Sequence, residues 1–580
     1  MGAVELLVSL LAVSGSVLCG ALVQEPVVAP QPSTPLPTRQ QSWDAPPTED
    51  SYDNQIFFRL ATLLQHWPNT RYPSGASIVP GTIPIGTTLY HGRGDTNLPS
   101  EPDWLAFDPE HSTVFARGSN SRLFTFVTTR PLRILYFDGS SAAKLTSGAA
   151  DTQDLLAWGR IGNQTFADEQ RRIVDLCKWG EPLGIDGYVR MEMSFEVMYC
   201  NFYQGIEVVS SLHILPTEAG RMPGVPPGGG IPGRPPSPPD STSLPAPTGT
   251  RPPHPRFPTE PRPTNWKGAL LPMRQRGIEA FQAGAWHRRA PGEIRVRLDV
   301  ARLVSLYDPA LQSGTQTRKG LEKVQHRGKG LSQDDIDIFR AWVIDSVQQN
   351  APETSGVDWQ ALTTVIMDRY SSRLEYLQLL LSPDRISANA TAVVHDVRTQ
   401  LMIMLMPDLT PDTVPSSSAS GAAAQYSQAR RRETPTNEWV KPILDHCSSY
   451  LVSHLPQDKF TREERTLYAG ISGTLHEICR VLSLLWSDAY DPLPEVEPTD
   501  MANRWRIQVD ELTQWLDWSM WNKCTPECGL DSICFIPTWP MEIGMHPGGR
   551  GGGEEDLTKI NWTPKCLQKG NETAWDMSLF

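Results

Sequence analysis

Four residues are notable for the chemistry that their types and order could support: a histidine, two aromatic residues and a glutamate. His91 ends the apolar run TTLYHG, Trp104 follows thirteen residues later, and Phe115 follows eleven residues after that. Glu196 lies inside the apolar segment FEVMY, where a charged side chain costs free energy unless it faces solvent or a site. A carboxylate beside a ribose can stabilise the oxocarbenium ion that forms when a glycosidic bond breaks, and aromatic rings can stack on a flat leaving group. The pattern therefore indicates cleavage of a glycosidic bond to ribose.

At these residues the chain resembles the ADP-ribosyltransferase superfamily, nearest its His-Tyr-Glu branch, which includes the poly-ADP-ribose polymerases and the diphtheria-type toxins. In that branch a first strand carries an aromatic-His-Gly motif. A second motif places two aromatic residues about eleven positions apart, and a third is a strand with a glutamate and a tyrosine. The matching residues of this chain are Tyr90, His91, Gly92, Trp104, Ala106, Phe115, Glu196 and Tyr199. The resemblance covers residues 85–205, and the whole chain also resembles uncharacterised fungal secreted proteins.

The resemblance implies NAD as the substrate and gives each matching residue a role. His91 would hydrogen-bond the nicotinamide ribose, and Gly92 would offer backbone groups to the carboxamide. Trp104 and Phe115 would flank the nicotinamide ring. Glu196 would polarise the ribose 2′-hydroxyl and stabilise the cation, so that Glu196 and His91 are the expected catalytic residues and no metal is expected. The implied activity is hydrolysis of NAD or transfer of ADP-ribose to an unknown protein or glycan acceptor.

Residues 51–215 contain the elements that must position this site. The strand-like segments are rich in Tyr, Phe, Val and Ile and read TTLYHG, RLFTFVTT, LRILYFDG, DGYVRM and SFEVMYCNF. They alternate with helical segments such as DEQRRIVDLCKWG, which predicts an α+β or α/β fold. With the resemblance, the expected fold is an ADP-ribosyltransferase-like mixed β core. In that fold His91 and Glu196 should face one cleft within about 10 Å of each other, with the two aromatic side chains lining it. Tyr199 should point away from Glu196, because successive side chains of a strand point to opposite faces.

A Pro-rich segment divides the chain. Seventeen prolines occur between positions 216 and 263, and proline removes backbone donors, so we expect a disordered linker between two domains. Beyond it, capping-box signals at Ser332 and Thr461 precede apolar residues at helical spacing, which predicts a mainly α-helical domain. The first such stripe is Ile336, Phe339, Val343 and Val347. The expected organisation is a signal peptide at 1–21, a disordered Pro-rich leader at 22–50, the transferase-like domain at 51–215, the linker at 216–265, the helical domain at 266–490 and a Cys/Trp-rich region at 491–580.

The first residues form an apolar run of signal-peptide length that ends in small residues, which indicates secretion. Retention of this run as a membrane anchor is the alternative, and no later segment holds about 20 uninterrupted apolar residues that could span a membrane. Four N-x-S/T glycosylation acceptors fit an exported chain. Their asparagines are Asn163, Asn389, Asn561 and Asn571.

Eight cysteines remain after removal of the signal segment, and an even number in an exported chain predicts disulfides. Cys177 and Cys200 are the only cysteines of the mature first domain, so we expect them to pair. A helix-to-helix bond between Cys447 and Cys479 is plausible. The remaining four allow three connectivities, and the sequence does not choose among them. They are Cys524, Cys528, Cys534 and Cys566.

Composition excludes one class of partner and leaves two functions open. The net charge of −13 disfavours nucleic acid, because phosphate binding needs clustered Lys and Arg. One interpretation is a secreted glycoprotein that cleaves NAD. The other is a non-catalytic extracellular protein that uses the same fold as a binding surface. The convergence of His91 and Glu196 on one cleft discriminates between them.

Overall fold

The computed structural model describes residues 42–116, 120–143, 148–162, 166–191, 194–214, 279–280, 282–284, 288–348, 352–413, 437–490, 496–536 and 563–569. The predicted signal peptide, most of the leader and the predicted linker lie outside these ranges. The described residues form both helices and a mixed sheet. The prediction of an α+β fold with a helical C-terminal region is therefore confirmed.

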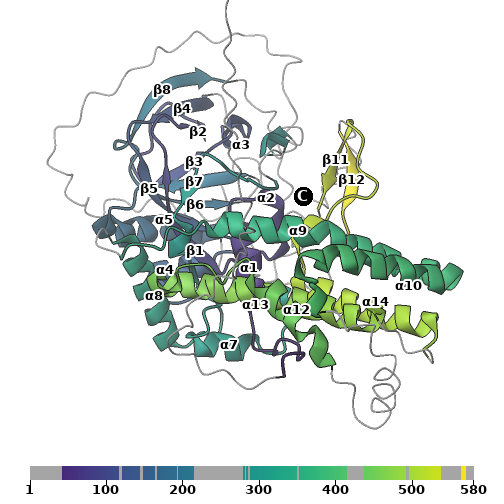
Figure 1. Ribbon diagram of the computed structural model, residues 1–580. Helices are drawn as coiled ribbons and strands as arrows, with labels where there is room; N and C mark the ends of the chain where they lie inside the picture. Colours follow the sequence, from purple (N-terminus) through teal and green to yellow (C-terminus); the bar gives the residue numbers. More distant parts are fainter. Residues whose placement is uncertain are drawn as a thin grey trace, which may run out of the picture. The chain divides into compact units, whose positions relative to one another are not determined.

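Within the described residues, ten strands form one sheet in the order β10-β1-β5-β6-β7-β3-β2-β4-β8, with β9 also pairing with β1 (upper left in Figure 1). The β5–β6 pair is parallel, and the other pairs in the sheet are antiparallel. The strands are β1 (Ser77–Ile83), β2 (Thr88–Arg93), β3 (Asp103–Ala106), β4 (Arg122–Thr128), β5 (Leu132–Phe137), β6 (Gly187–Met191), β7 (Phe195–Tyr199), β8 (Ile206–His213), β9 (Arg297–Leu298) and β10 (Val304–Ser305).

The burial of each strand follows its place in the sheet. Every residue of β6 and β7 is buried, as expected for near-continuous apolar strands that are covered on both faces. Strand β8 lies at one end of the strand order and is mostly partly or fully exposed. The predicted strand segments around TTLYHG, RLFTFVTT, LRILYF, DGYVRM and SFEVMYC correspond to β2, β4, β5, β6 and β7.

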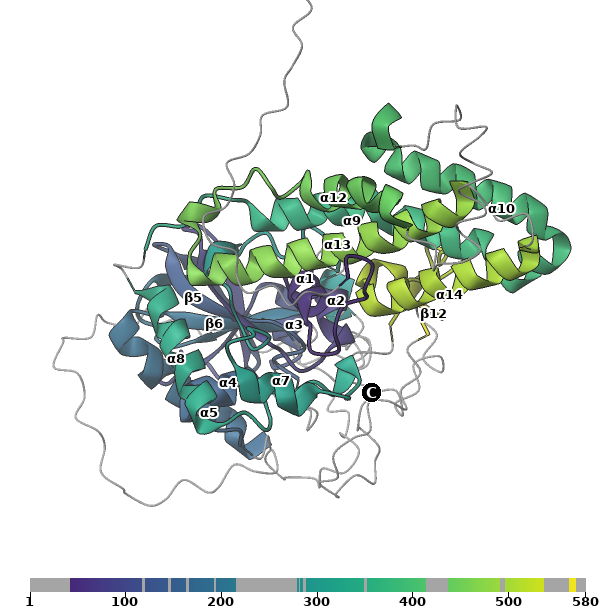
Figure 2. The ribbon, with the colours of Figure 1, turned by 60° about the horizontal axis from the view of Figure 1, so that its bottom comes forward.

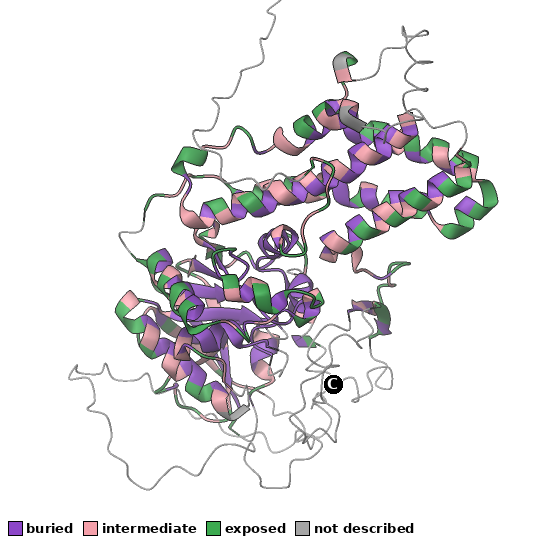
Figure 3. Ribbon diagram, turned by 90° about the horizontal axis from the view of Figure 1, so that it is seen from below, coloured by how far each residue is buried: buried purple, intermediate pink, exposed green. Residues whose placement is uncertain are grey.

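The helices Gln333–Val347, Trp359–Leu380, Pro383–Leu405 and Pro498–Leu516 each bury one stripe and expose the opposite side (Figure 3), as amphipathic helices do. The helix Asp53–Ala61 is instead buried on nearly all sides. The stripe of Ile336, Phe339, Val343 and Val347 is buried as predicted. The described α-helices are α1 (Asp53–Ala61), α2 (His66–Arg71), α3 (Pro109–Thr113), α4 (Asp151–Trp158), α5 (Phe166–Gly180), α7 (Gln312–Arg318), α8 (Gln333–Val347), α9 (Trp359–Leu380), α10 (Pro383–Leu405), α12 (Lys441–Ser449), α13 (Arg462–Tyr490) and α14 (Pro498–Leu516).

Both predicted helix starts carry the expected cap. The Ser332 hydroxyl accepts from the Asp335 N–H at 3.2 Å at the start of α8. At the start of α13 the bonds are reciprocal: the Glu464 N–H donates to the Thr461 hydroxyl at 3.2 Å, and the Thr461 N–H donates to the Glu464 carboxylate at 3.0 Å. These side chains pair backbone donors that the first helical turn leaves without a partner.

Elements from the two sides of the predicted linker share one sheet and one core, which differs from the expectation of a separate helical domain. Strands β9 and β10, which follow the linker in sequence, pair with β1. Helix α1 packs against α13 and α9 and lies between α13 and the sheet in Figure 1 and Figure 2. One hydrophobic cluster includes Ile56, Phe124 and Leu475, and the described residues from position 43 onward belong to one compact unit.

Four disulfides join the eight cysteines that remain after position 19. The predicted Cys177–Cys200 and Cys447–Cys479 pairs are confirmed. The connectivity that the sequence left open is resolved as Cys524–Cys534 and Cys528–Cys566. The second of these joins the hairpin of β11 (Ser532–Phe535) and β12 (Lys565–Gln568) to the segment before it. In the described part of the chain, no helix has the length and apolar character needed to span a membrane.

Candidate functional site

The three motifs of the sequence lie on adjacent strands. Strand β3 pairs with β2 on one side and with β7 on the other. The register aligns Tyr90 with Ala106, and Ala106 with Glu196. Because directly opposed residues of antiparallel strands point to the same face, these three residues form one row across the sheet. Trp104 and Gly92 each lie two residues along from a member of that row, so they share its face.

His91 points to the opposite face. It follows Tyr90 directly in β2 and aligns with Phe124 of β4, and successive strand residues alternate faces. Its ring lies 5.4 Å from the ring of Phe202, and Nδ1 lies 2.5 Å from the carbonyl oxygen of Trp104. The expectation that His91 and Glu196 face one cleft is therefore wrong, since that expectation took no account of the strand register.

Burial is the main influence on the pKa of His91. The side chain is 6 % exposed, and this burial lowers the pKa of His91, an effect that the nearby Asp103 carboxylate and the Trp104 carbonyl oppose. Nε2 lies 3.7 Å from a carboxylate oxygen of Asp103. Tyr199, on the same face as His91, is buried and contacts Phe202. Tyr199 thus points away from Glu196, as predicted.

Glu196 lies in a buried network of charges. Its carboxylate accepts a hydrogen bond from Nε of Arg190 at 2.8 Å, and both side chains are almost fully buried. Arg190 also donates to Glu169 of α5 and, at 3.1 Å, to Gln153 of α4. Burial alone would lower the pKa of Arg190, but the carboxylates of Glu169 and Glu196 raise it above its ordinary value. Arg190 is therefore positively charged and neutralises Glu196.

The same network extends to a second arginine. Arg172 of α5 donates to Asp154 of α4 at 2.7 Å and to Glu169 at 2.6 Å. Burial raises the pKa of Asp154, and Arg172 opposes that shift. Two helices are thus joined to β6 and β7 through buried ion pairs. Sequence reasoning missed Arg190; the signal that could have found it was an arginine inside the apolar segment DGYVRM.

The other expected site residues have different surroundings. A Cβ at Gly92 would meet the carbonyl oxygen of Ser112 at 1.9 Å, so this glycine lets the backbone of α3 approach β2. Trp104 is partly buried against the core. Phe115 is 49 % exposed and lies 5.8 Å from the ring of His111. The backbone of α3 therefore occupies the space that a side chain at position 92 would need.

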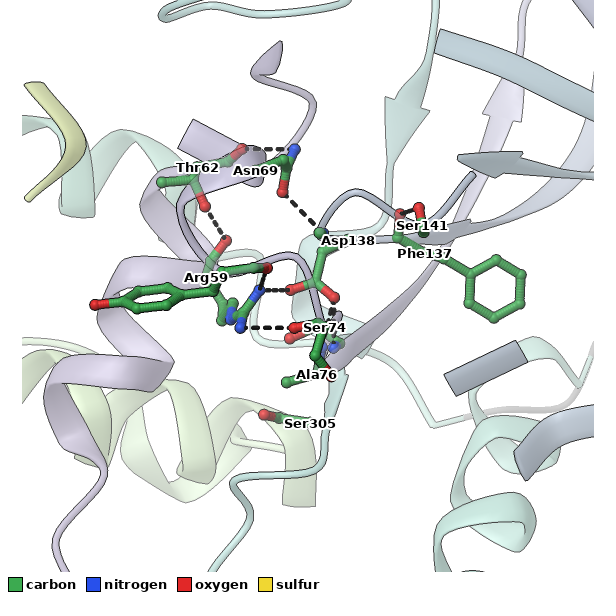
Figure 4. Close-up of polar contacts among 12 residues, drawn as sticks. Arg59, Thr62, Asn69, Ser74, Ala76, Phe137, Asp138, Ser141 and Ser305 are labelled. Atoms are coloured by element: carbon green, nitrogen blue, oxygen red, sulfur yellow. Dashed lines mark hydrogen bonds and ion pairs between the residues drawn. The ribbon is translucent and has the colours of Figure 1, made fainter. Parts of the chain in front are cut away.

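A second buried charge cluster lies at the end of β5 (Figure 4). The Asp138 carboxylate accepts from Arg59 at 3.3 Å and from the N–H groups of Ala76 and Ser77 at 2.8 Å each. Burial raises the pKa of Asp138, and the Arg59 guanidinium opposes that rise. Gly139 has φ +74°, a left-handed backbone conformation that glycine adopts without steric cost. The cluster links α1 to β1 and β5 by hydrogen bonds. Its role is therefore structural.

A cavity of about 360 Å³ lies between α13 on one side and the end of α12 with the turn that follows it on the other. Its lining contains hydroxyl groups, one tyrosine and one histidine, and none of these residues belongs to the motif strands. The lining residues are Ser448, Ser449, Val452, Ser453, Tyr468, Ser472, Gly473 and His476. The sequence does not predict this cavity, because its walls come from two segments that are brought together by tertiary packing.

Comparison with known proteins finds similarity to yeast proteins. A family model described as the YPL277C N-terminal domain matches residues 50–122 and 116–231, the part that contains β1 to β8. The uncharacterized protein YOR389W of Saccharomyces cerevisiae is 24 % identical over 589 residues, which cover 87 % of this chain and 84 % of that protein. The uncharacterized protein YPL277C of the same yeast is 30 % identical over 237 residues, 32 % of this chain and 48 % of that protein. No solved structure matches.

Proposed function

We propose that the chain is a non-catalytic extracellular binding protein that uses an ADP-ribosyltransferase-like sheet as a scaffold. The observation that carries this proposal is the buried ion pair of Glu196 with Arg190 at 2.8 Å. A carboxylate that stabilises a ribosyl cation must present negative charge to it. The guanidinium of Arg190 cancels that charge, and His91 lies on the other face of the sheet. The proposal retains the predicted extracellular location. It replaces the NAD cleavage that the resemblance implies with a binding role.

A surface on the α9–α10 hairpin supports a binding role. Arg369 of α9 donates to the carbonyl oxygen of Met404 in α10 at 3.0 Å, which places the middle of α9 within reach of the end of α10. Large apolar side chains near this contact are 41–59 % exposed. They are Val365, Met402, Ile403 and Met406. Exposed apolar patches mark interaction sites, and methionine adapts to varied partner surfaces, so the partner class we propose is a protein.

Site-specific photo-crosslinking tests this surface. The chain with a photoreactive residue at position 406 is secreted by intact cells and then irradiated. It should form a covalent complex with one partner protein, seen as a product of discrete mass. The matched control is the same residue at Arg385, which is exposed at the opposite end of α10. Absence of an adduct at position 406, or the same adducts at both positions, would contradict the proposal.

NAD cleavage is the second candidate, because one observation favours it. Tyr90, Ala106 and Glu196 form one row, and Trp104 lies on the same face. The indole N–H of Trp104 is buried and has no hydrogen-bond partner among the described residues. A bound ligand would supply the missing acceptor. Equilibrium dialysis with labelled NAD separates the candidates. The scaffold proposal expects no saturable binding, whereas saturable binding that Trp104→Leu abolishes would favour the enzyme.

A further inference from the structure

Helix α10 is interrupted at one glycosylation acceptor of the sequence. Asn389 has φ −161° and ψ 85°, which is non-helical, within the helix Pro383–Leu405. Its side-chain Oδ1 accepts a hydrogen bond from the N–H of Ala392 at 3.0 Å. This is the bond of an N-cap residue to the third residue of a helix. Asn389 therefore ends one helical segment and caps the next.

The interruption turns Asn389 toward solvent. Ile386 and Val393 belong to the buried stripe of α10, and in an unbroken helix position 389 would lie next to that stripe, three residues after one and four before the other. Instead Asn389 and Thr391 are both exposed. The motif Asn-Ala-Thr is thus held at the surface at a break in regular helix (α10 is at the right in Figure 1).

We propose that Asn389 carries an N-linked oligosaccharide. In this modification Nδ2 bonds to C1 of a sugar supplied by a lipid-diphosphate-linked oligosaccharide. The C1–O bond to the diphosphate breaks, the lipid diphosphate leaves with the electron pair, and Nδ2 loses one proton. The recognised motif is N-x-S/T with x other than proline, and Ala390 occupies the middle position.

The cap geometry is compatible with the attached sugar. The cap bond uses Oδ1, whereas the sugar replaces a hydrogen on Nδ2, so the helix keeps its cap after modification. Nδ2 makes no hydrogen bond to the residues that the structure describes, and no such bond has to break. The other three acceptors, Asn163, Asn561 and Asn571, lie outside the described residues. The proposal rests on passage through the secretory pathway and is independent of NAD cleavage or partner binding.

The test is mass spectrometry of the full chain recovered from the medium of cells that secrete it. Enzymatic removal of N-linked sugar converts a modified asparagine to aspartate. The proposal expects this conversion at position 389, together with a faster-migrating band after treatment. An unmodified Asn389 in the secreted chain would overturn the proposal, whether or not the other acceptors are modified.

Variants separate the sugar from the fold. Asn389→Asp and Thr391→Ala should each remove one glycan from the band pattern, while Thr391→Ser should retain it. Asp also serves as an N-cap, and Thr391→Ala leaves Asn389 in place, so both variants keep the cap and should be secreted in folded form. A band pattern that is the same in all three variants and the wild type would contradict modification at Asn389.

Discussion

Arg190 of β6 donates a hydrogen bond to Glu196 of β7 across 2.8 Å, and the two side chains are 1 % and 5 % exposed. The glutamate that the sequence marks as the catalytic residue is thus half of a buried ion pair. Since removal of one partner from such a pair leaves a buried charge uncompensated, this contact has measurable consequences for stability and for activity.

Replacement of Arg190 by methionine should lower the free energy of unfolding by about 3–5 kcal/mol, because Glu169 and Glu196 lose their shared cation. Urea denaturation measures this loss. The matched variant is Arg171→Met. Arg171 is 64 % exposed and pairs with Asp175 at 3.3 Å, so its replacement should cost less than about 1 kcal/mol. Similar small losses in both variants would mean that the buried network contributes little.

His326 should make the stability depend on pH. Burial, reinforced by Arg318, lowers the pKa of His326 to about 4. The unfolded chain, with an ordinary pKa of about 6.5, takes up this proton first as the pH falls. The contribution of His326 is therefore complete above pH 6.5 and is lost toward pH 4, by up to about 3 kcal/mol. The difference in unfolding free energy between the wild type and His326→Gln should change over this window, and parallel pH profiles would contradict the assignment.

The Cys177–Cys200 disulfide joins α5 to the end of β7, and the two cysteines have a sequence separation of 23. Replacing both cysteines by alanine should lower the free energy of unfolding by about 3 kcal/mol in the chain-entropy model, because the unfolded chain gains freedom. Non-reducing peptide mapping of the wild type should recover the linked peptides. Recovery of Cys177 and Cys200 as free thiols would show that this disulfide does not form.

Cleavage within residues 216–263 should not separate the two halves. The sequence predicts that this Pro-rich segment is open to protease, but β9 and β10 pair with β1 and the core is shared. Limited proteolysis should therefore give two fragments that elute together in size-exclusion chromatography and separate only in denaturant. Independent elution without denaturant would restore the expectation of two separate domains.

Helices and their caps were predicted correctly, because they depend on residues close in sequence. The strand pairings between distant segments were not predicted. The stripe from Ile336 to Val347 and the caps at Ser332 and Thr461 depend on neighbours in sequence, so helical spacing identified them. The two-residue strands β9 and β10 are too short to give a periodic signal, and their pairing with β1 depends on tertiary contacts. For this reason the sequence suggested a separate helical domain.

The same limit applies to the candidate site. The sequence placed His91 and Glu196 on strands, and both are on strands. Which face each side chain takes depends on register, and a shift of one residue moves a side chain to the other face. The pairing of Glu196 with Arg190 likewise requires β6 and β7 to be adjacent in a known register, which the spacing of the motifs does not contain.

The release of nicotinamide from NAD by the purified full chain tests the central claim most directly, namely that the ion pair of Glu196 with Arg190 leaves the chain without NAD-cleaving activity. The account predicts that wild type and Glu196→Gln release nicotinamide at the same rate as buffer. Release by the wild type that Glu196→Gln abolishes would contradict the account, because this substitution removes the charge of residue 196 and keeps its shape.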